Sequence, residues 1–434
     1  MPDNNAGTIG ELKKLLEQET PRLLYKELQD FVKYYLDRRD TYLSVMERHP
    51  SPLYILETTV LRQKASQFYQ AFSAVLPNVA CFYAVKSNSY PEVSRVLVEE
   101  GYGLDVSSGL ELKRALSTNT HAIIFSGPGK TNNELSRAVA HADRVTVLMD
   151  SFGELDRLNN VASEQNRIVT AGIRITTNSA GVWRKFGIPL GELGLFFKAA
   201  SLCPNVSLTG IQFHTSWNLT PEKQCAVIRS LGKVISNLTD TYRKQISFID
   251  IGGGYWPPQG EWLQPAAIPT GILGTALGKT SRDFNMHYKN GAVSIGVFSE
   301  RLAAEIKARI FPHLRCAIHC EPGRWLCNDA MHIMVTVIDK KAPDCVITDG
   351  ATNAVGWERF ESDYCPILNL STPSLLEKKC DILGSLCTPR DIWGYSYFGK
   401  DILPGDILLV PCQGAYTYSL RQEFIKPVPE VVVI

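Results

Sequence analysis

The sequence predicts an α/β protein built from a (β/α)8 (TIM) barrel, a mostly-β C-terminal domain and a helical N-terminal extension. Three observations predict this fold. Short apolar runs of strand length recur between residues 80 and 320, and helix-compatible stretches separate most of them. After Glu321, short strand-like pieces follow one another with few helical patterns between them. The predicted limits are 1–50 for the extension, 51–325 for the barrel and 326–434 for the β domain.

The extension is predicted from its periodicity. Between residues 11 and 48, apolar residues recur mostly at three- and four-residue steps among charged ones. This spacing is typical of an amphipathic helical segment, which we expect to pack on the main body. The run His49-Pro50-Ser51-Pro52 ends it, because prolines interrupt helices.

The barrel is predicted from strands that alternate with helices. Helix-compatible stretches such as Glu92–Glu100 and Leu110–Leu116 separate the strand candidates, and parallel neighbours need such crossovers. Eight strands in this alternation favour a closed barrel over an open sheet. The long interval from Gly254 to about Cys316 predicts an inserted loop near the site opening and a helix around Ser299–Arg309. The strand candidates lie near Phe82, Leu104, Ile124, Val147, Ile173, Ile211, Ile249 and Ile318.

The β domain is predicted from four short apolar pieces and the turns between them. These pieces are Met331–Ile338, Cys345–Thr348, Ile407–Val410 and Val428–Ile434.

Composition excludes several classes of partner. The net charge of +1 gives no reason to expect nucleic acid or an anionic membrane surface. No apolar stretch reaches the roughly 18 residues that a membrane span needs, and the first residues lack the pattern of a secretory signal. Eleven cysteines, an odd number, favour a reducing cytoplasm over a disulfide framework. No Cys/His spacing predicts a metal site.

Polar residues at the ends of the predicted strands are the candidate functional groups. Because the carboxyl ends of barrel strands surround one pocket, residues distant in sequence become neighbours there. Taken singly, each has an ordinary explanation as a solvated lysine, a satisfied histidine or a glycine turn. Their equivalent positions favour a shared function. Lys86 ends the first strand, Asp105 the second, His214 the sixth and Glu321 the eighth, and Gly252, Gly253 and Gly254 follow the seventh.

These residue types together indicate one cofactor. Consecutive glycines leave backbone N–H groups uncovered, which suits a phosphate. A lysine in a partly desolvated pocket can form a Schiff base with an aldehyde. A carboxylate that faces a heteroaromatic nitrogen keeps that nitrogen protonated. Phosphate, aldehyde and basic ring nitrogen describe pyridoxal 5′-phosphate.

The chain resembles the fold type III pyridoxal-phosphate decarboxylases, the group of diaminopimelate, ornithine and arginine decarboxylases with an alanine racemase-type barrel. The matching stretches occur in the family's order over roughly residues 50 to 430. They are Ser51-Pro52-Leu53-Tyr54-Ile55, Tyr83-Ala84-Val85-Lys86-Ser87-Asn88, Gly103-Leu104-Asp105-Val106-Ser107-Ser108, Lys185-Phe186-Gly187-Ile188, Asp250-Ile251-Gly252-Gly253-Gly254, Glu321-Pro322-Gly323-Arg324, Cys387 with Asp391, and Gly414-Ala415-Tyr416.

The resemblance implies a role for each matching residue. Lys86 would hold the cofactor as an imine with Asp105 beside it, Glu321 would pair with the pyridine nitrogen, and His214 would stack on the ring. Cys387 would reach the partner subunit's site and protonate the carbanion after CO2 leaves, so the resemblance implies an obligate homodimer with shared active sites. The phosphate ligands implied are Gly252, Gly253, Gly254, Arg324 and Tyr416.

One departure from the family concerns the phosphate. The family follows its histidine with a small residue, a glycine and then a serine that helps to hold phosphate. This chain has His214-Thr215-Ser216-Trp217-Asn218. Either Ser216 or Thr215 takes over the contact in a shifted geometry, or Trp217 reshapes the phosphate wall, and the retained contact at Ser216 is favoured.

A second departure concerns the substrate. Family members that act on diamino acids carry Asp or Glu directly after the cysteine, where this chain has Thr388. Without that acid a buried ammonium loses its partner, a deficit of roughly 2–5 kcal/mol. The tail is therefore predicted not to be a simple diamino-acid cation, and a siderophore or antibiotic precursor would fit. The candidate substrate-binding residues are Arg184, Arg359, Thr388 and Asp391, with Arg390 in a neighbouring segment.

Three other functions compete with decarboxylation. Alanine racemases place an arginine where this chain has Glu321, which leaves a weaker electron sink, so Glu321 favours decarboxylation. Non-catalytic homologues that act as regulatory partners typically lose the lysine or the cysteine, and both remain here. A nucleotide-binding protein would carry G-x-G-x-x-G at the start of a helix after the first strand, which this chain lacks.

Overall fold

The computed structural model describes residues 10, 13–14, 16, 20–178, 180–278, 286–356 and 362–434. Contacts divide the chain into two compact units, each of which is described by itself. The barrel unit comprises Thr58–Pro258 and Val293–Asn328, and the sheet unit comprises Met1–Glu57, Gln259–Ala292 and Asp329–Ile434. Among the described residues, no helix combines the length and the apolar character that a membrane crossing requires. The predicted domain limits at residues 50 and 325 stay predictions.

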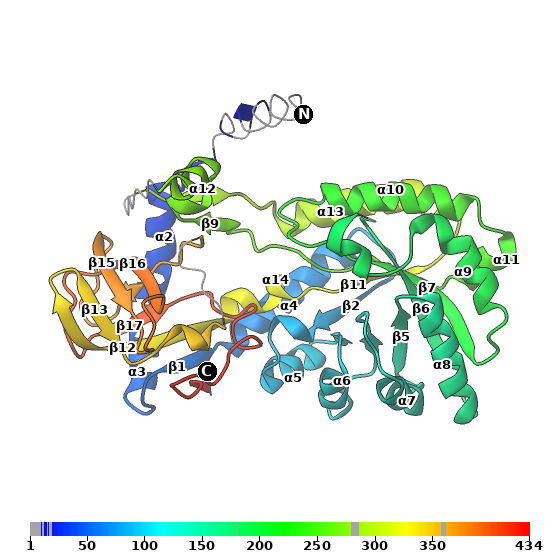
Figure 1. Cartoon of the computed structure of the whole chain (residues 1–434), viewed down its shortest axis with the longest axis horizontal. Helices are drawn as coiled ribbons and strands as arrows, with labels where there is room; N and C mark the ends of the chain where they lie inside the picture. Colours follow the sequence, from blue (N-terminus) through cyan, green and yellow to red (C-terminus); the bar gives the residue numbers. More distant parts are fainter. Residues whose placement is uncertain are drawn as a thin grey trace. The chain divides into compact units, whose positions relative to one another are not determined.

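The barrel unit confirms the predicted closed barrel of eight parallel strands. The strand order around the barrel is β11-β2-β3-β4-β5-β6-β7-β8, so each strand pairs with the neighbouring barrel strand in sequence. Figure 1 labels β2, β5, β6, β7 and β11 of this barrel. All eight predicted strand positions lie within these strands. Their bounds are β2 (Val79–Ala84), β3 (Gly103–Val106), β4 (Ile123–Phe125), β5 (Val145–Met149), β6 (Val169–Ile175), β7 (Val206–Phe213), β8 (Phe248–Asp250) and β11 (Ala317–Cys320).

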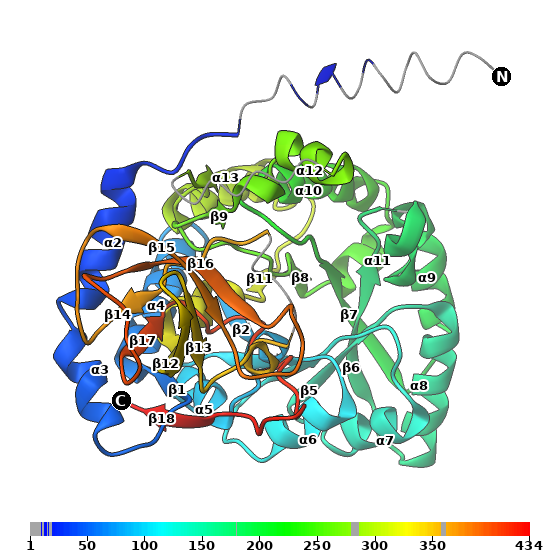
Figure 2. The same cartoon turned by 60° about the vertical axis from the view of Figure 1, so that its left-hand side comes forward.

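Helices cover the outside of the barrel (Figure 2). Side chains of Ser108, Thr131 and Ser151 cap three of them by accepting a backbone N–H of the first turn. The predicted helices at 92–100, 110–116 and 299–309 are all present. The bounds are α4 (Thr58–Ser73), α5 (Pro91–Glu99), α6 (Gly109–Leu116), α7 (Asn132–Ala140), α8 (Phe152–Glu164), α9 (Leu193–Ala200), α10 (Glu222–Ser236), α11 (Asp240–Gln245), α13 (Ile295–Arg309) and α14 (Arg324–Cys327).

The barrel interior is a packed core. Phe82, Ile124, Leu148 and Phe248 form one buried cluster, because parallel strands covered on both faces are apolar throughout. The His319 ring stacks on Phe248 at a centroid distance of 4.4 Å and an interplanar angle of 9°. Burial lowers the pKa of His319 to about 4, so the ring is neutral at pH 7 and fills the interior like an aromatic residue.

The sheet unit contains a mixed eight-stranded sheet in the order β13-β15-β16-β14-β17-β12-β1-β18. An additional pairing between β13 and β12 closes the part from β13 to β12 into a ring. The four predicted strands are present, and the sequence analysis missed the others. The bounds are β1 (Leu53–Leu56), β12 (Met331–Ala342), β13 (Cys345–Thr348), β14 (Leu368–Asn369), β15 (Glu377–Leu383), β16 (Ile392–Phe398), β17 (Ile407–Val410) and β18 (Glu430–Val433).

The missed strands carry weak sequence signals. β15 begins Glu377-Lys378-Lys379 and exposes both lysines, and β16 contains Gly394, so neither shows clear apolar alternation. β1 lies directly before the barrel in sequence, but it pairs with β12 and β18. Only tertiary pairing assigns it to this sheet.

From residue 20 to residue 50, the chain forms two helices, α2 (Tyr25–Leu36) and α3 (Arg39–Met46). The predicted helical pattern began at residue 11, and the described residues Lys13, Lys14 and Leu16 are helical, whereas residues 20–24 are not. Backbone bonds to the insertion explain the difference, since the N–H of Leu23 donates to His287 O and the N–H of Lys289 donates to Pro21 O, each at 2.9 Å. This insertion holds β9 (Glu261–Leu263), α12 (Pro269–Ala276) and β10 (Tyr288–Asn290).

A buried carboxylate ties these helices to the sheet. Glu57 accepts hydrogen bonds from Tyr42 Oη at 2.7 Å, from His332 Nε2 at 2.9 Å and from Arg38. His332 Nδ1 accepts the N–H of Cys412, so Nε2 carries the proton that it donates. Although burial raises the pKa of Glu57, the hydrogen bonds from His332 and Arg38 lower it to about 2.

We predict that Glu57→Gln lowers the free energy of unfolding of the sheet unit at pH 7 by about 3 kcal/mol. Because the folded-state pKa is depressed, the contribution of Glu57 is complete above about pH 4.3 and is lost as the pH falls towards 2. Urea denaturation at pH 7 and pH 3 measures this. The variant should lose most of its deficit at the lower pH. The exposed Glu47→Gln serves as control, and equal effects of the two substitutions would contradict the prediction.

Candidate active site

The first polar pair at the barrel mouth is Lys86 with Asp105. Lys86 lies in a 3-10 turn, η1 (Val85–Ser87), directly after β2, and Asp105 lies on the neighbouring strand β3. Lys86 Nζ donates to Asp105 Oδ2 at 2.6 Å, and Ser126 Oγ donates to Asp105 Oδ1 at 2.6 Å. Burial and the negative charge of Glu321 raise the pKa of Asp105. The ammonium of Lys86 lowers this pKa, but by less than burial raises it. The pair therefore holds an amine at the carboxyl end of a strand.

The second group is built around Glu321, directly after β11. Its Oε1 accepts from Gln212 Nε2 at 3.2 Å, and the side chain is 2% exposed. Burial alone raises the pKa of Glu321, but the contact with His214 and the positive charges of Lys86 and Arg174 lower it to about 2. Glu321 is thus ionised at pH 7.

Asp250 is the uncharged neighbour of Glu321. Burial and the charge of Glu321 raise the pKa of Asp250 well above its ordinary value. Two adjacent buried carboxyl groups cannot both ionise readily, so here the proton stays on Asp250 and the charge stays on Glu321.

His214 joins this carboxylate to the glycine turn. Its Nδ1 lies 3.2 Å from the amide N of Gly253 and 3.5 Å from Glu321 Oε2. Burial lowers the pKa of His214 more than Glu321 raises it, so the ring is neutral at pH 7. The N–H of Gly253 donates to Nδ1, so the proton of the neutral ring lies on Nε2.

The glycine turn after β8 needs its glycines for two reasons. Gly252 and Gly254 have φ values of +69° and +81°, which favour glycine. A Cβ on Gly253 would lie 2.2 Å from Glu321 O, and one on Gly254 would lie 2.4 Å from Thr215 O. The turn therefore packs directly on the backbone that carries the neighbouring site residues.

Two of the three amides in this turn are already bonded. The N–H of Gly252 donates to Asp250 Oδ1 at 2.8 Å, and Gly253 is bonded to His214 as described. Of the three, only the Gly254 N–H has no hydrogen-bond partner among the described residues. The nest predicted from three uncovered amides thus offers one amide to an anion. Arg324 was predicted from the sequence as a further phosphate ligand.

The residues after His214 form the rim of this turn. Asn218 is buried and pins the turn, since its Nδ2 donates to Gly253 O at 3.0 Å and to Thr215 Oγ1 at 2.9 Å. The Ser216 hydroxyl has no partner among the described residues, whereas the Thr215 hydroxyl is occupied by Asn218. Trp217 has a φ of +53° and is 57% exposed.

Trp217 lies beside a second tryptophan. Its ring centroid is 5.7 Å from that of Trp256, and the guanidinium of Arg324 lies 4.2 Å from the Trp256 centroid. A guanidinium held over an aromatic face keeps its orientation. Trp217 therefore occupies the position where the family has a serine, and Trp256 lies beside it.

Sequence reasoning missed several residues of this pocket. Arg174 on β6 is buried, pairs in register with Gln212 and lies with its guanidinium 4.5 Å from the Phe186 centroid. Glu111 accepts the N–H of Ser107 at 2.7 Å, and burial raises its pKa. A charged residue in an otherwise apolar strand was the available signal for Arg174, whereas nothing distinguished Glu111 from a surface helix residue.

Two further predicted site residues are Arg184 and Arg359. Arg184 is exposed in the short helix η2 (Gly181–Lys185), with no ion pair among the described residues. Arg359 lies outside the described residues.

The other predicted site residues lie in the sheet unit. Cys387 is exposed in the turn between β15 and β16, and Thr388 follows it half-buried. Asp391 is 2% exposed. Its Oδ1 accepts the N–H and the hydroxyl of Thr352, both at 2.8 Å, and its Oδ2 accepts the N–H of Leu386 at 2.6 Å. Tyr416 has a φ of +60° in the segment after β17.

Comparisons with known proteins define the class of this chain. Residues 61–265 match the model of the pyridoxal binding domain of pyridoxal-dependent decarboxylases. The diaminopimelate decarboxylase of Methanothermobacter thermautotrophicus is 25% identical over 406 residues, which covers 90% of this chain and 88% of that protein. The L-glutamyl-[BtrI acyl-carrier protein] decarboxylase of Niallia circulans is 25% identical over 403 residues, which covers 87% of this chain and 86% of that protein.

Solved structures show the same fold. The diaminopimelate decarboxylase of M. jannaschii in complex with L-lysine aligns with a TM-score of 0.76 at 20% identity, over 91% of this chain and 89% of that one. The Helicobacter pylori diaminopimelate decarboxylase complexed with L-lysine aligns with a TM-score of 0.75 at 20% identity, over 91% of this chain and 94% of that one.

The fold and the pocket therefore define a pyridoxal-phosphate-binding barrel enzyme. The chain belongs to the fold type III pyridoxal-phosphate-dependent decarboxylases, the family of ornithine, arginine and diaminopimelate decarboxylases. Its cofactor is pyridoxal phosphate, and its substrate is an amino acid.

We predict that Asn218→Ala weakens the affinity of the cofactor-free protein for pyridoxal phosphate about tenfold, because Gly253 in the glycine turn and the neighbouring Thr215 each lose a buried hydrogen bond. Titration of tryptophan fluorescence with the cofactor measures this. Asn237→Ala, which removes one exposed bond to Lys233 O, is the matched control. An Asn218→Ala affinity equal to that of the control would show that the turn holds its shape without Asn218.

Proposed function

We propose that this protein decarboxylates an amino acid whose side chain ends in an anionic or conjugated group. The observation that carries decarboxylation is the position of Glu321, which is buried directly after β11 and whose pKa is lowered while burial raises that of Asp250. When bound, pyridoxal phosphate supplies an aldehyde and a protonated ring that stabilises negative charge at the substrate α-carbon. A carboxylate that stays charged opposite the ring nitrogen supports this chemistry better than the arginine of the racemases.

The residues present fit the cofactor. Lys86 would bind its aldehyde, and Asp105 orients the Lys86 ammonium through their 2.6 Å bond. The neutral ring of His214 would lie against the cofactor ring. We propose that the phosphate is held by the Gly254 N–H, Arg324 and Ser216, with Tyr416 as a further contact.

Cys387 is proposed as the acid that protonates the α-carbon after CO2 has left. Its thiol is exposed in a turn that Asp391 stabilises from inside by accepting three hydrogen bonds. Because these donors occupy both carboxylate oxygens, we propose that Asp391 positions the Cys387 turn, and that Thr388 is the nearer neighbour of the substrate.

Three observations support the proposed substrate tail. Thr388 provides no carboxylate for a distal ammonium, and the Asp391 carboxylate is fully used within the protein. Arg184 has no ion pair among the described residues and would be available to an anion. The Niallia circulans relative, which is 25% identical to this chain, is an L-glutamyl-[BtrI acyl-carrier protein] decarboxylase. A glutamyl group on a carrier protein is a conjugated substrate. We propose a precursor of the siderophore or antibiotic kind.

We also propose a homodimer with shared active sites and a cytoplasmic location. The dimer is supported by the resemblance, in which the cysteine serves the partner's site. The location is supported by the cysteines, since all eleven lie within the described residues and none forms a disulfide.

We predict that the purified protein with pyridoxal phosphate releases CO2 from an acylated diaminopropionate or another anionic amino acid at least about tenfold faster than from ornithine or lysine. Mass detection of the product amine across a panel that includes meso-diaminopimelate measures this. Lys86→Ala should abolish release and the visible absorbance of the bound cofactor. Efficient turnover of ornithine alone would overturn the substrate proposal, and α-deuterium exchange without CO2 would indicate a racemase.

The dimer can be tested by complementation. Lys86→Ala and Cys387→Ala should each be inactive, and a reassorted mixture should recover up to about a quarter of wild-type activity, because half of the dimers then hold one intact site. Mixing two preparations of Lys86→Ala is the control. No recovery after confirmed subunit exchange would place both residues in one chain's site.

A further inference from the structure

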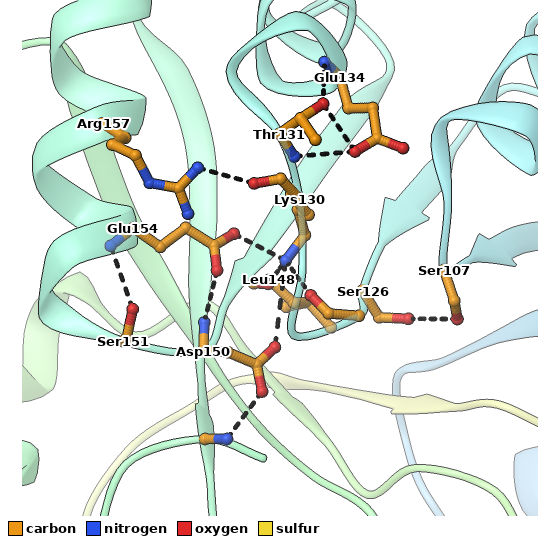
Figure 3. A network of polar contacts seen from close by, with 12 residues as sticks. Ser107, Ser126, Lys130, Thr131, Glu134, Leu148, Asp150, Ser151, Glu154 and Arg157 are labelled. Atoms are coloured by element: carbon orange, nitrogen blue, oxygen red, sulfur yellow. Dashed lines mark hydrogen bonds and ion pairs between the residues drawn. The ribbon is translucent and has the colours of Figure 1, made fainter. Parts of the chain in front are cut away.

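A buried lysine outside the proposed cofactor site organises a polar cluster beside the barrel mouth (Figure 3). The Lys130 side chain is 1% exposed. Its ammonium donates to Gly127 O at 2.6 Å, to Leu148 O at 2.7 Å and to Glu154 Oε1 at 2.7 Å. A buried ammonium is costly unless all three of its donors are satisfied, and here they are.

Asp150, at the end of β5, is the second member of this cluster. Its Oδ2 lies 4.0 Å from Lys130 Nζ, and its N–H donates to Glu154 Oε2 at 3.2 Å. Asp150 Oδ1 accepts the N–H of Gly187 at 2.7 Å. The ammonium of Lys130 thus lies between two carboxylates, and one of them reaches out to a segment that follows β6.

The 176–187 segment follows β6, and its two ends are joined where Gly187 and Ile188 lie against Arg174 and Thr176. We call this junction the neck of the segment. The N–H of Ile188 donates to Arg174 O at 3.0 Å, and the N–H of Thr176 donates to Ile188 O at 2.8 Å. Gly187 has a φ of +67°, and a Cβ there would lie 2.6 Å from Arg174 O. The neck is therefore tight, and Asp150 is its side-chain anchor.

The neck lies next to the proposed active site. Phe186 holds the Arg174 guanidinium over its ring, and Arg174 pairs in register with Gln212, which donates to Glu321. At the start of the segment, Thr177 Oγ1 donates to His214 O at 3.3 Å. The segment also carries Arg184, the proposed contact for the substrate tail.

We propose that Asp150, braced by Lys130, is a positioning residue for substrate binding: it locks the neck of the 176–187 segment so that Arg174 and Arg184 keep their places at the barrel mouth. The proposal extends the proposed function, since the substrate contact it assists belongs to that function. In this role Asp150 acts through the Gly187 N–H rather than on the substrate or the cofactor.

Three variants separate this role from general stability. Asp150→Ala removes the acceptor for the Gly187 N–H. Asp150→Asn keeps an amide oxygen at that position. Thr131→Ala removes the cap of α7, directly after Lys130, and leaves the Asp150 bond intact.

The first measurement needs no catalysis. Trypsin cleaves after Arg184 and Lys185, both exposed within the segment, and mass spectrometry identifies those fragments. In the cofactor-loaded protein we expect Asp150→Ala to be cleaved there about tenfold faster than wild type, because the neck opens more often. Asp150→Asn and Thr131→Ala should be cleaved at close to the wild-type rate.

The second measurement is steady-state turnover of the accepted substrate. We expect Asp150→Ala to raise KM about tenfold with kcat changed about twofold or less, and Asp150→Asn to restore KM. Unchanged cleavage in Asp150→Ala, equal effects in Thr131→Ala, or faster cleavage with an unchanged KM would each overturn the proposal. If the wild-type protein releases no CO2 from any amino acid, the proposed function fails, while the trypsin result still decides whether Asp150 locks the neck.

Discussion

Negative charge buried at the barrel mouth is the constraint on which the rest of the site depends. Asp105, Asp250 and Glu321 meet there with almost no exposure. Such a group is stable only when its charges are paired or neutralised. Lys86 and Ser126 satisfy Asp105, a proton neutralises Asp250, and Lys86 and Arg174 sustain the charge of Glu321. Each of these partners comes from the end of a different strand, so only a closed barrel assembles them.

The same physical device recurs wherever a functional loop must hold its shape. A buried carboxylate accepts backbone N–H groups from the loop, as Asp150 does for Gly187 and Asp391 for Leu386. A charged acceptor forms stronger hydrogen bonds than a neutral one, and it needs no regular secondary structure around it. The loops that carry the proposed chemistry are thus fixed by acids that take no part in it. Glu57 in the other unit accepts side-chain hydrogen bonds instead, from Tyr42 and His332, and so connects helices to sheet.

The two departures from the family pattern differ in kind. At the glycine turn the family's serine is absent, whereas a half-buried Ser216 hydroxyl and the Arg324 guanidinium packed on Trp256 are present, and we propose that these groups hold the phosphate instead. At Thr388, nothing in the turn replaces the missing acid, because Asp391 is engaged by Thr352 and Leu386. Under the proposed function, the first departure affects how the cofactor is held, and the second affects which substrate is bound.

The sequence by itself determined the barrel, because parallel strands buried on both faces leave continuous apolar runs at regular spacing. It also determined the residues at the strand ends, since a polar group after an apolar run is visible without any structure. It could not identify β1 as part of the second sheet, or β15 as a strand, because pairing across long stretches of chain decides these and local patterns do not. Likewise, only the tertiary structure decided that two amides of the glycine turn are occupied, that Arg174 joins the pocket and that Asp150 anchors a distant loop. Those facts are distances between groups far apart in the chain, and residue order does not encode them directly.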